Sequence, residues 1–248
     1  LKSYAESGAH EGTVLIAQEQ SLGKGRLGRS FYSPFGTGLY MSIILRPDFD
    51  AQKSLFITTA AAVAVCRGID KMLQSRTGIK WVNDVYIGGR KICGILTEAS
   101  VDFESGCLNY AVLGIGINIK PPEGGFPDEI ADTAGVLFNK EPPEGIRTKL
   151  TAEILREFFS IYRSIEKNGY MQEYKERSIL KDMDIAFIRD GKSYNARVTD
   201  ITDDAGLEVK LENGETMVLN AGEVSVSKDS LKKLKTDYED DKKEVGDK

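Results

Sequence analysis

Residues 23–29 combine three glycines with three cations, in the order Gly-Lys-Gly-Arg-Leu-Gly-Arg. Glycine lets a backbone approach a ligand closely, and the amide groups of such a loop can form a concavity that binds anions. Lysine and arginine add full positive charges, and arginine can hold a carboxylate or phosphate through two parallel hydrogen bonds. The loop therefore predicts a site that holds two anionic groups side by side.

Other glycine-loop sites fit the surrounding sequence less well. Gly23, Gly25 and Gly28 match the G-x-G-x-x-G spacing, but a dinucleotide site needs a helix directly after the loop. Proline and glycine residues at positions 34–38 disfavour that helix. The loop also lacks the Gly-Lys-Ser/Thr of a Walker A motif, and no later H-R-D or D-F-G motif indicates a kinase. On this loop alone, a basic surface turn without a ligand remains the alternative.

Composition restricts the partners and the compartment. The 248 residues are 41% hydrophobic and 29% charged, which is typical of a globular protein with one large domain or a large and a small one. The net charge of −5 argues against nucleic-acid binding through this chain. No apolar run is long enough to cross a bilayer, so we expect no membrane span.

Cysteine and histidine usage restricts the chemistry further. The three cysteines, Cys66, Cys93 and Cys107, lack metal-ligand spacing and lie in apolar runs, which predicts buried free thiols and a cytoplasmic location. The single histidine, His10, lies in an expected turn. Any catalysis should therefore proceed without histidine, and the sequence assigns no metal site.

Alternating strands and helices should position the basic loop. Apolar runs predict a buried strand at residues 13–20 and a strand at residues 39–46, one on each side of the loop. An alanine-rich helix should follow. The remaining expected elements of residues 1–180 are helices at 1–7, 51–76, 128–138 and 143–167, a further helical turn or two at 169–177, and strands at 79–82, 85–87, 91–100 and 109–119.

The composition changes near Met183. Short strands with the hairpin signals Asp190-Gly191 and Asn213-Gly214 predict a small all-β unit over residues 183–226. Residues 227–248 are dense in charges of both signs, and we expect a frayed helix or disorder there.

A second constellation, Lys80-Trp81-Val82-Asn83-Asp84, lies where a strand ends. By itself it could be a turn after a core tryptophan. Together with the basic loop and two later motifs it forms an ordered series that resembles the biotin protein ligases, also called biotin–[acetyl-CoA-carboxylase] ligases. The resemblance runs from Gly12 to about Val226, and the two later motifs are Arg90-Lys91-Ile92-Cys93-Gly94-Ile95-Leu96-Thr97-Glu98 and Gly114-Ile115-Gly116-Ile117-Asn118.

The resemblance implies a fold and a reaction. The expected fold is an α/β (α+β) catalytic domain with a mixed β-sheet, followed by a small SH3-like all-β barrel. The expected enzyme joins biotin to ATP to give biotinyl-5′-adenylate and pyrophosphate, then passes biotin to a lysine of a biotin carboxyl carrier protein. Mg²⁺ is expected with the triphosphate. A homodimer is also possible.

The resemblance also implies roles for individual residues. Lys80 and Arg26 would be catalytic. The biotin-binding residues would be Gln20, Gly23, Lys24, Gly25, Arg26, Lys80, Gly94, Gly114 and Gly116. The nucleotide-binding residues would be Arg29, Phe31, Asn83, Lys91 and Asn118.

Three departures from the family pattern stand out. Lys24 replaces the usual arginine, and Val82 replaces the usual proline. The family's Ser-Thr-Asn segment, which contacts biotin, would lie just before Leu1, so we expect residues upstream. Two alternatives remain: a lipoate- or octanoate-protein ligase of the same fold, and a bifunctional ligase and transcriptional repressor with a DNA-binding domain upstream.

Overall fold

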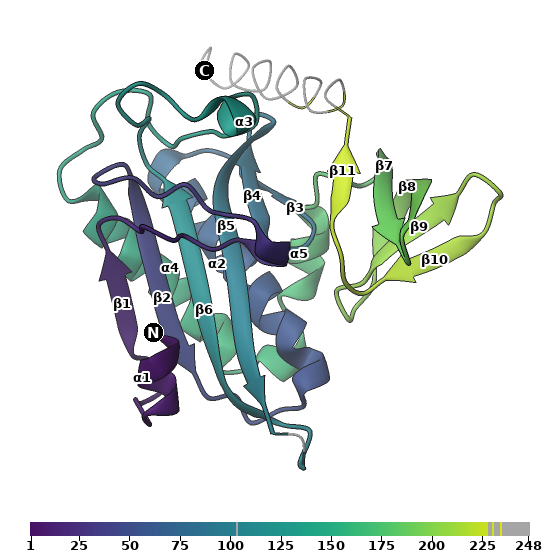
Figure 1. The fold of residues 1–248 in the computed structure, drawn as a ribbon, viewed down its shortest axis with the longest axis horizontal. Coiled ribbons are helices and arrows are strands. Elements are labelled where there is room, and N and C mark those ends of the chain that lie inside the picture. Colours follow the sequence, from purple (N-terminus) through teal and green to yellow (C-terminus); the bar gives the residue numbers. More distant parts are fainter. Residues whose placement is uncertain (103, 228–229, 231–233, 235–248) are drawn as a thin grey trace.

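The structure is a computed structural model that describes residues 1–102, 104–227, 230 and 234. It contains a six-stranded sheet covered on one face by helices, and a second, five-stranded sheet beside it (Figure 1). The expected charged tail, residues 227–248, lies outside the described residues except at positions 227, 230 and 234.

The larger sheet has the strand order β1-β2-β6-β5-β4-β3. Its neighbouring strands are antiparallel throughout. β5 and β6 are its longest strands and lie at its centre, with β2 on the other side of β6 (Figure 1). The strands are β1 (Val14–Ala17), β2 (Gly38–Leu45), β3 (Gly78–Lys80), β4 (Asp84–Ile87), β5 (Arg90–Val101) and β6 (Leu108–Asn118).

The expected mixed sheet is therefore wrong. β2 and β3 do run in the same direction and are joined through a helix, as in a parallel unit, but β6, β5 and β4 lie between them. The helical crossover thus spans the sheet without placing two parallel strands side by side. Among the described residues, parallel pairing is confined to the isolated bridges Ile79 with Ser178 and Lys91 with Ala134.

Helices α2 (Ser54–Leu73), α4 (Ile146–Tyr162) and α5 (Met171–Glu176) form the layer behind the sheet (Figure 1). The alanines at positions 60, 61, 62 and 64 are fully buried, which lets the α2 backbone pack closely. Gly68 of α2 likewise lets α4 pack closely against this helix, because a Cβ on Gly68 would lie 2.9 Å from Ile154 Cγ1. Within the described part of the chain, no helix is both long and apolar enough to cross a membrane.

Several element boundaries differ from the prediction. α2 ends at Leu73 because Gln74 adopts a left-handed conformation, and α4 is shorter than the expected 143–167. The helix expected at 128–138 is only α3 (Asp128–Ala131). The backbone amides of Leu137 and Phe138 instead bond to the carbonyls at positions 118 and 119. The helices expected at 1–7 and 169–177 are confirmed as α1 (Lys2–Glu6), which precedes β1, and α5.

Two burial predictions also fail. β1 is an edge strand rather than a buried one, and the side chains of Leu15 and Ile16 are 42% and 54% exposed. Cys66 and Cys93 are buried free thiols as expected, but Cys107 is exposed because it lies in the turn between β5 and β6.

The second sheet has the order β10-β9-β8-β7-β11 and is also antiparallel. Its strands are β7 (Asp184–Arg189), β8 (Lys192–Ile201), β9 (Leu207–Leu211), β10 (Thr216–Leu219) and β11 (Val224–Val226). The hairpin at Asp190-Gly191 is confirmed, with positive φ at both residues. The prediction missed β11, which pairs with β7.

The two sheets share one continuous core, and a tryptophan joins them. Trp81, in the turn after β3, is buried and donates from Nε1 to the carbonyl of Ala205 at 2.7 Å. The second sheet thus rests on the turn that follows Lys80.

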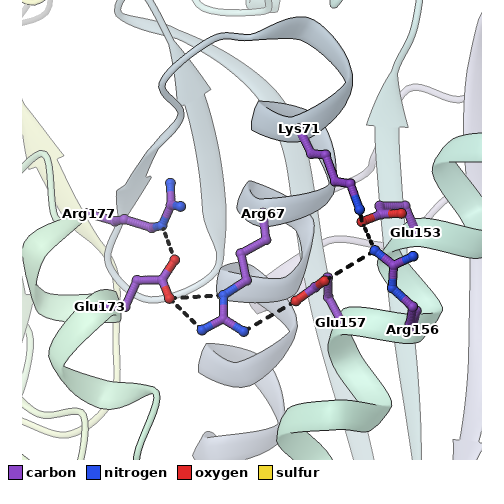
Figure 2. A network of polar contacts seen from close by, with 7 residues as sticks. All are labelled: Arg67, Lys71, Glu153, Arg156, Glu157, Glu173 and Arg177. Atoms are coloured by element: carbon purple, nitrogen blue, oxygen red, sulfur yellow. Dashed lines mark hydrogen bonds and ion pairs between the residues drawn. The ribbon is translucent and has the colours of Figure 1, made fainter.

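A network of ion pairs ties the helical layer together (Figure 2). Arg67 of α2 contacts Glu157 of α4 at 3.3 Å and Glu173 of α5 at 2.6 Å. Glu173 also accepts from Arg177 at 2.9 Å, and Arg177 contacts Asp70 of α2 at 2.7 Å. Burial alone would raise the pKa of the Glu173 carboxyl, but the hydrogen bonds from Arg67 and Arg177 hold this pKa below its ordinary value.

We predict that Glu173→Gln destabilises the protein in a pH-dependent way. The substitution removes a charge held by two arginines and should cost about 1 kcal/mol, or roughly 3 °C in Tm at pH 7. The parent's advantage should persist above the unfolded carboxyl pKa of about 4.3 and disappear as the pH falls through the lower native value. Thermal unfolding at several pH values measures this. Glu141→Gln is the control, because Glu141 is 77% exposed and pairs only with Lys120 in the described structure.

Candidate functional site

A pocket of about 650 Å³ lies between the basic loop, strands β4 to β6 and residues of β11. The basic loop, residues 23–29, thus faces both sheets. Twelve of the predicted site residues line this pocket: Gln20, Lys24, Gly25, Arg26, Arg29, Phe31, Lys80, Asn83, Lys91, Gly94, Gly114 and Gly116.

The basic loop is closed on itself by backbone hydrogen bonds. The Gly25 amide donates to the Arg29 carbonyl at 2.7 Å, and the Phe31 amide donates to the Gly23 carbonyl at 2.8 Å. A short 3₁₀ turn spans Arg26–Gly28, where Leu27 and Gly28 have φ values of 52° and 76°. The glycines therefore permit a tight loop whose cationic side chains are presented to the pocket.

Two predicted site residues are not part of the pocket lining. A Cβ on Gly23 would lie 2.2 Å from the carbonyl oxygen of Phe31, so glycine there keeps the two ends of the loop together. Asn118, at the end of β6, donates to the carbonyl of Gly135 at 3.0 Å. The structure thus gives both residues contacts that support neighbouring backbone.

Several cations of the pocket have polar partners. Arg26 Nη1 donates to Asn83 Oδ1 at 3.2 Å, and Lys91 Nζ lies 2.7 Å from Asp84 Oδ1. Arg29 reaches across to the second sheet, where its Nη1 lies 2.8 Å from Glu223 Oε1. These contacts connect the loop, the turn after β3 and the residue before β11.

Lys80 ends β3 and pairs in register with Asp84, the first residue of β4. Burial lowers the pKa of the Lys80 ammonium, because desolvation disfavours its charged form. Asp84 and Glu223 oppose this pKa shift, whereas Lys91 and Arg29 add to it. Lys80 is therefore a desolvated cation among other cations, which favours the binding of an anion.

Two facing glycines form the floor of the pocket beneath an aromatic ring. Gly94 of β5 and Gly116 of β6 are direct partners in the sheet. Cβ atoms on them would lie 3.1 Å and 2.6 Å from the Phe31 ring, so the ring sits on bare backbone. Tyr40 meets this ring edge-on, with 6.5 Å between centroids.

Gln20, the predicted biotin contact, borders the same pocket. Its Oε1 accepts a hydrogen bond from the Ser33 hydroxyl at 2.9 Å. That contact joins Gln20 to Ser33, and these two residues flank the basic loop.

Several polar residues of the lining are not among the predicted site residues. Asp84 closes the quoted Lys80-to-Asp84 motif, and that position is the signal that could have marked it; in the structure it pairs with Lys91. Burial, followed by the charges of Asp84 and Glu223, raises the pKa of Tyr86. Glu223 had no signal, because it precedes the unpredicted strand β11. Lys2 and Glu98 form a further pair at 2.7 Å.

The arrangement suits the binding of a ligand with more than one anionic group. Six cationic side chains, two glycine-lined strands and an aromatic ring share the pocket. Within the described residues, no group of three or more His, Cys, Asp or Glu side chains could hold a metal ion. The protein is thus of mixed α and β class, with an antiparallel sheet and a basic glycine loop that borders its pocket.

Comparison with known proteins places the chain in a family. Residues 1–118 belong to the biotin/lipoate A/B protein ligase family. The chain is 39% identical over 166 residues to the bifunctional ligase/repressor BirA of Bacillus subtilis, covering 67% of this chain and 50% of that protein. The chain therefore spans about half the length of this relative.

Two further proteins match most of the chain. The biotin–[acetyl-CoA-carboxylase] ligase of Mycobacterium tuberculosis is 29% identical over 233 residues, covering 90% of this chain and 83% of that protein. The biotin protein ligase of Aquifex aeolicus, solved in complex with biotin and ATP, has a TM-score of 0.72 and 23% identity. That match covers 91% of this chain and 93% of the other, and shows a shared fold.

We predict that Gly116→Ala destabilises the protein through a clash with the Phe31 ring. The new methyl group would lie 2.6 Å from the ring and force it off the floor. Such overpacking typically costs about 1–3 kcal/mol, measurable by denaturant unfolding. In a Phe31→Ala background the same substitution should cost much less. Gly114→Ala is the matched control, because its nearest neighbour would be 3.5 Å away. Equal losses at both glycines would contradict this packing.

Proposed function

We propose that this chain is the catalytic part of a ligase that activates biotin with ATP and transfers it to a lysine of a biotin carboxyl carrier protein. The observation that carries the proposal is the gathering of Lys80, Arg26 and Lys91 in one pocket over paired backbone glycines. The names of the relatives in Bacillus and Mycobacterium support it.

The proposed first step joins two anions. A carboxylate oxygen of biotin attacks the α-phosphorus of ATP, the bond to the bridging oxygen breaks, and pyrophosphate leaves. Fixed cations reduce the repulsion between these groups and stabilise the charge that develops on the phosphate oxygens. A carboxylate is already a nucleophile, so no histidine is required.

The second step transfers the acyl group. The amine of the carrier lysine attacks the biotinyl carbonyl carbon, a new amide forms, and AMP leaves with the electrons of the broken mixed-anhydride bond. The amine must lose a proton in this step. Residues of both sheets line the pocket that the lysine side chain of a partner would have to enter.

The residues divide between two substrates in this proposal. Gln20, Gly23, Lys24, Gly25 and the glycines at 94, 114 and 116 serve biotin. Arg29, Phe31, Asn83, Lys91 and Asn118 serve the nucleotide. Lys80 and Arg26 act between them, near the reacting carboxylate and α-phosphate. Gly23 and Asn118 would act through the backbone that they support rather than by lining the pocket.

Mg²⁺ fits this site as a companion of ATP. The three carboxylates that line the described pocket each lie beside a cation: Asp84 beside Lys91, Glu98 beside Lys2, and Glu223 beside Arg29. Mg²⁺ commonly binds through substrate phosphates and one or two carboxylates. Asp84, next to Lys80, is the carboxylate we expect nearest to it. The ion would supply neutralisation of triphosphate charge.

The finer architecture belongs to the proposal as well. We assign residues 1–180 to the catalytic domain and residues 183–226 to an SH3-like barrel. A second antiparallel sheet with short hairpins supports the assignment. The cytoplasmic location and the possible homodimer are further predictions.

A lipoate- or octanoate-protein ligase is the second candidate, because the family that matches residues 1–118 includes lipoate ligases. Incubation with ATP, a carrier protein and labelled biotin, lipoate or octanoate separates these activities. We expect label on the carrier from biotin alone. Labelling by lipoate or octanoate instead would overturn the assignment. The repressor activity named for BirA would require DNA binding by the full-length protein.

We predict that Lys80→Met abolishes most adenylate formation. Losing one preorganised donor to a transition-state charge typically costs on the order of 10²–10³ in rate. Pyrophosphate release at saturating biotin and ATP is the measurement. Lys149→Met is the control, because Lys149 is exposed on α4. If Lys80→Met keeps a rate near that of the control, Lys80 has no part in the reaction.

The lowered pKa of Lys80 predicts an alkaline limit to activity. The neutral amine cannot stabilise phosphate charge, so kcat/KM for biotin should fall as the pH rises through a value below the ordinary lysine pKa of about 10.4. Lys80→Arg keeps its charge throughout this range, so its fall should move to higher pH. An unchanged alkaline limb in Lys80→Arg would assign the titration to another group.

A further inference from the structure

The turn between β3 and β4, residues 81–83, is held from three sides. Trp81 donates to the Ala205 carbonyl of the second sheet at 2.7 Å. Asn83 Nδ2 donates to the Ile95 carbonyl of β5 at 2.8 Å, and the Ile95 amide returns a bond to the Asn83 carbonyl at 3.0 Å. The third contact comes from the helical layer behind the sheet.

That third contact is made by Tyr174 of α5. Its side chain is fully buried, and its hydroxyl donates to the Val82 carbonyl at 3.0 Å. Val82 is itself buried, so this carbonyl would be left in an apolar setting without the hydroxyl. The hydroxyl thus fixes the Val82 carbonyl, in the middle of the turn, from the side of the helical layer.

Contacts at the end of α5 hold this helix, and with it Tyr174, in position. Arg177, directly after α5, contacts Asp70 of α2 at 2.7 Å, and its carbonyl accepts from the Ile79 amide of β3 at 2.7 Å. The helix is therefore attached both to α2 and to the strand that carries Lys80. Because α5 is held in this way, the hydroxyl of Tyr174 can keep the Val82 carbonyl in one position.

The turn in turn places two functional groups. Lys80 lies two residues before Val82, and Asn83 lies directly after it. The side-chain oxygen of Asn83 accepts from Arg26 of the basic loop at 3.2 Å. A shift of the Val82 carbonyl would therefore move Lys80 and the anchor of Arg26 together.

We propose that Tyr174 is a positioning residue of the site, whose buried hydroxyl sets the place of Lys80 and Asn83 through the Val82 carbonyl. Tyr174 does not itself line the pocket in the described structure. Its effect on rate rests on the proposed function, whereas its effect on the turn does not.

Tyr174→Phe tests the proposal, and Tyr170→Phe is a matched control. Tyr170 is also a buried tyrosine at α5, but its hydroxyl contacts Thr59 at 2.8 Å and the Phe56 carbonyl at 3.1 Å, away from the turn. Each variant keeps its ring and loses buried hydrogen bonds. Both should therefore fold and lose a similar amount of stability, on the order of 5 °C in Tm.

Only Tyr174→Phe should affect the chemical step. Small misplacements of reacting groups can cost up to about 100-fold, so we expect kcat for adenylate formation to fall by roughly 10- to 100-fold with little change in KM for biotin or ATP. Tyr170→Phe should stay close to the parent. A kcat for Tyr174→Phe within about twofold of the parent, or an equal loss in Tyr170→Phe, would overturn the proposal.

Hydrogen exchange gives a readout that needs no activity. The Ile95 amide, bonded to the Asn83 carbonyl, should exchange faster in Tyr174→Phe and at the parental rate in Tyr170→Phe. Unchanged exchange in Tyr174→Phe would refute the positioning role. A parent protein that forms no biotinyl-adenylate would refute the proposed function instead, and the exchange rates would still decide the role of Tyr174.

Discussion

Repulsion among like charges is the constraint on which the pocket depends. Arg26, Arg29, Lys80 and Lys91 line one cavity, and burial already disfavours the charged form of Lys80. The fold offsets this cost with partners drawn from separate elements: Asn83 for Arg26, Asp84 for Lys91 and Glu223 for Arg29. An anionic ligand adds the negative charge that these cations lack, so binding and local stability are linked.

The partners also explain why the site needs both sheets. Glu223 directly precedes β11 of the small sheet, and Trp81 attaches Ala205 of the same unit to the turn after β3. The first contact joins the basic loop to the start of β11, and the second joins the turn after β3 to the loop between β8 and β9. The second sheet is thus a wall of the pocket, and its position is coupled to the strand that carries Lys80.

The motifs that line the pocket were recognisable in the sequence, whereas the residues that hold these motifs in position were not. The basic loop and the Lys80-to-Asp84 motif were recognisable because glycine, charge and aromatic residues occur there in unusual order. The helical layer and the hairpins followed from periodicity and from Asp190-Gly191. Tyr174 and Glu223 could not be found, because a buried tyrosine in a helix and a glutamate before a three-residue strand have no local signal. The antiparallel sheet was missed because a strand–helix–strand pattern does not say which strands become neighbours.

The position of β6 has a consequence for how the protein is made. β6 follows β5 in the chain, yet it also completes the open edge of β2, which was synthesised much earlier. Until β6 emerges, β2 presents an apolar strand with Met41, Ile43 and Leu45 and one unpaired edge. An open strand edge favours association between chains. The pairing of β2 with β6 is also long-range in sequence, which slows folding. A ribosome pausing before β6 would thus hold a nascent chain whose β2 edge is still open to pairing with another chain.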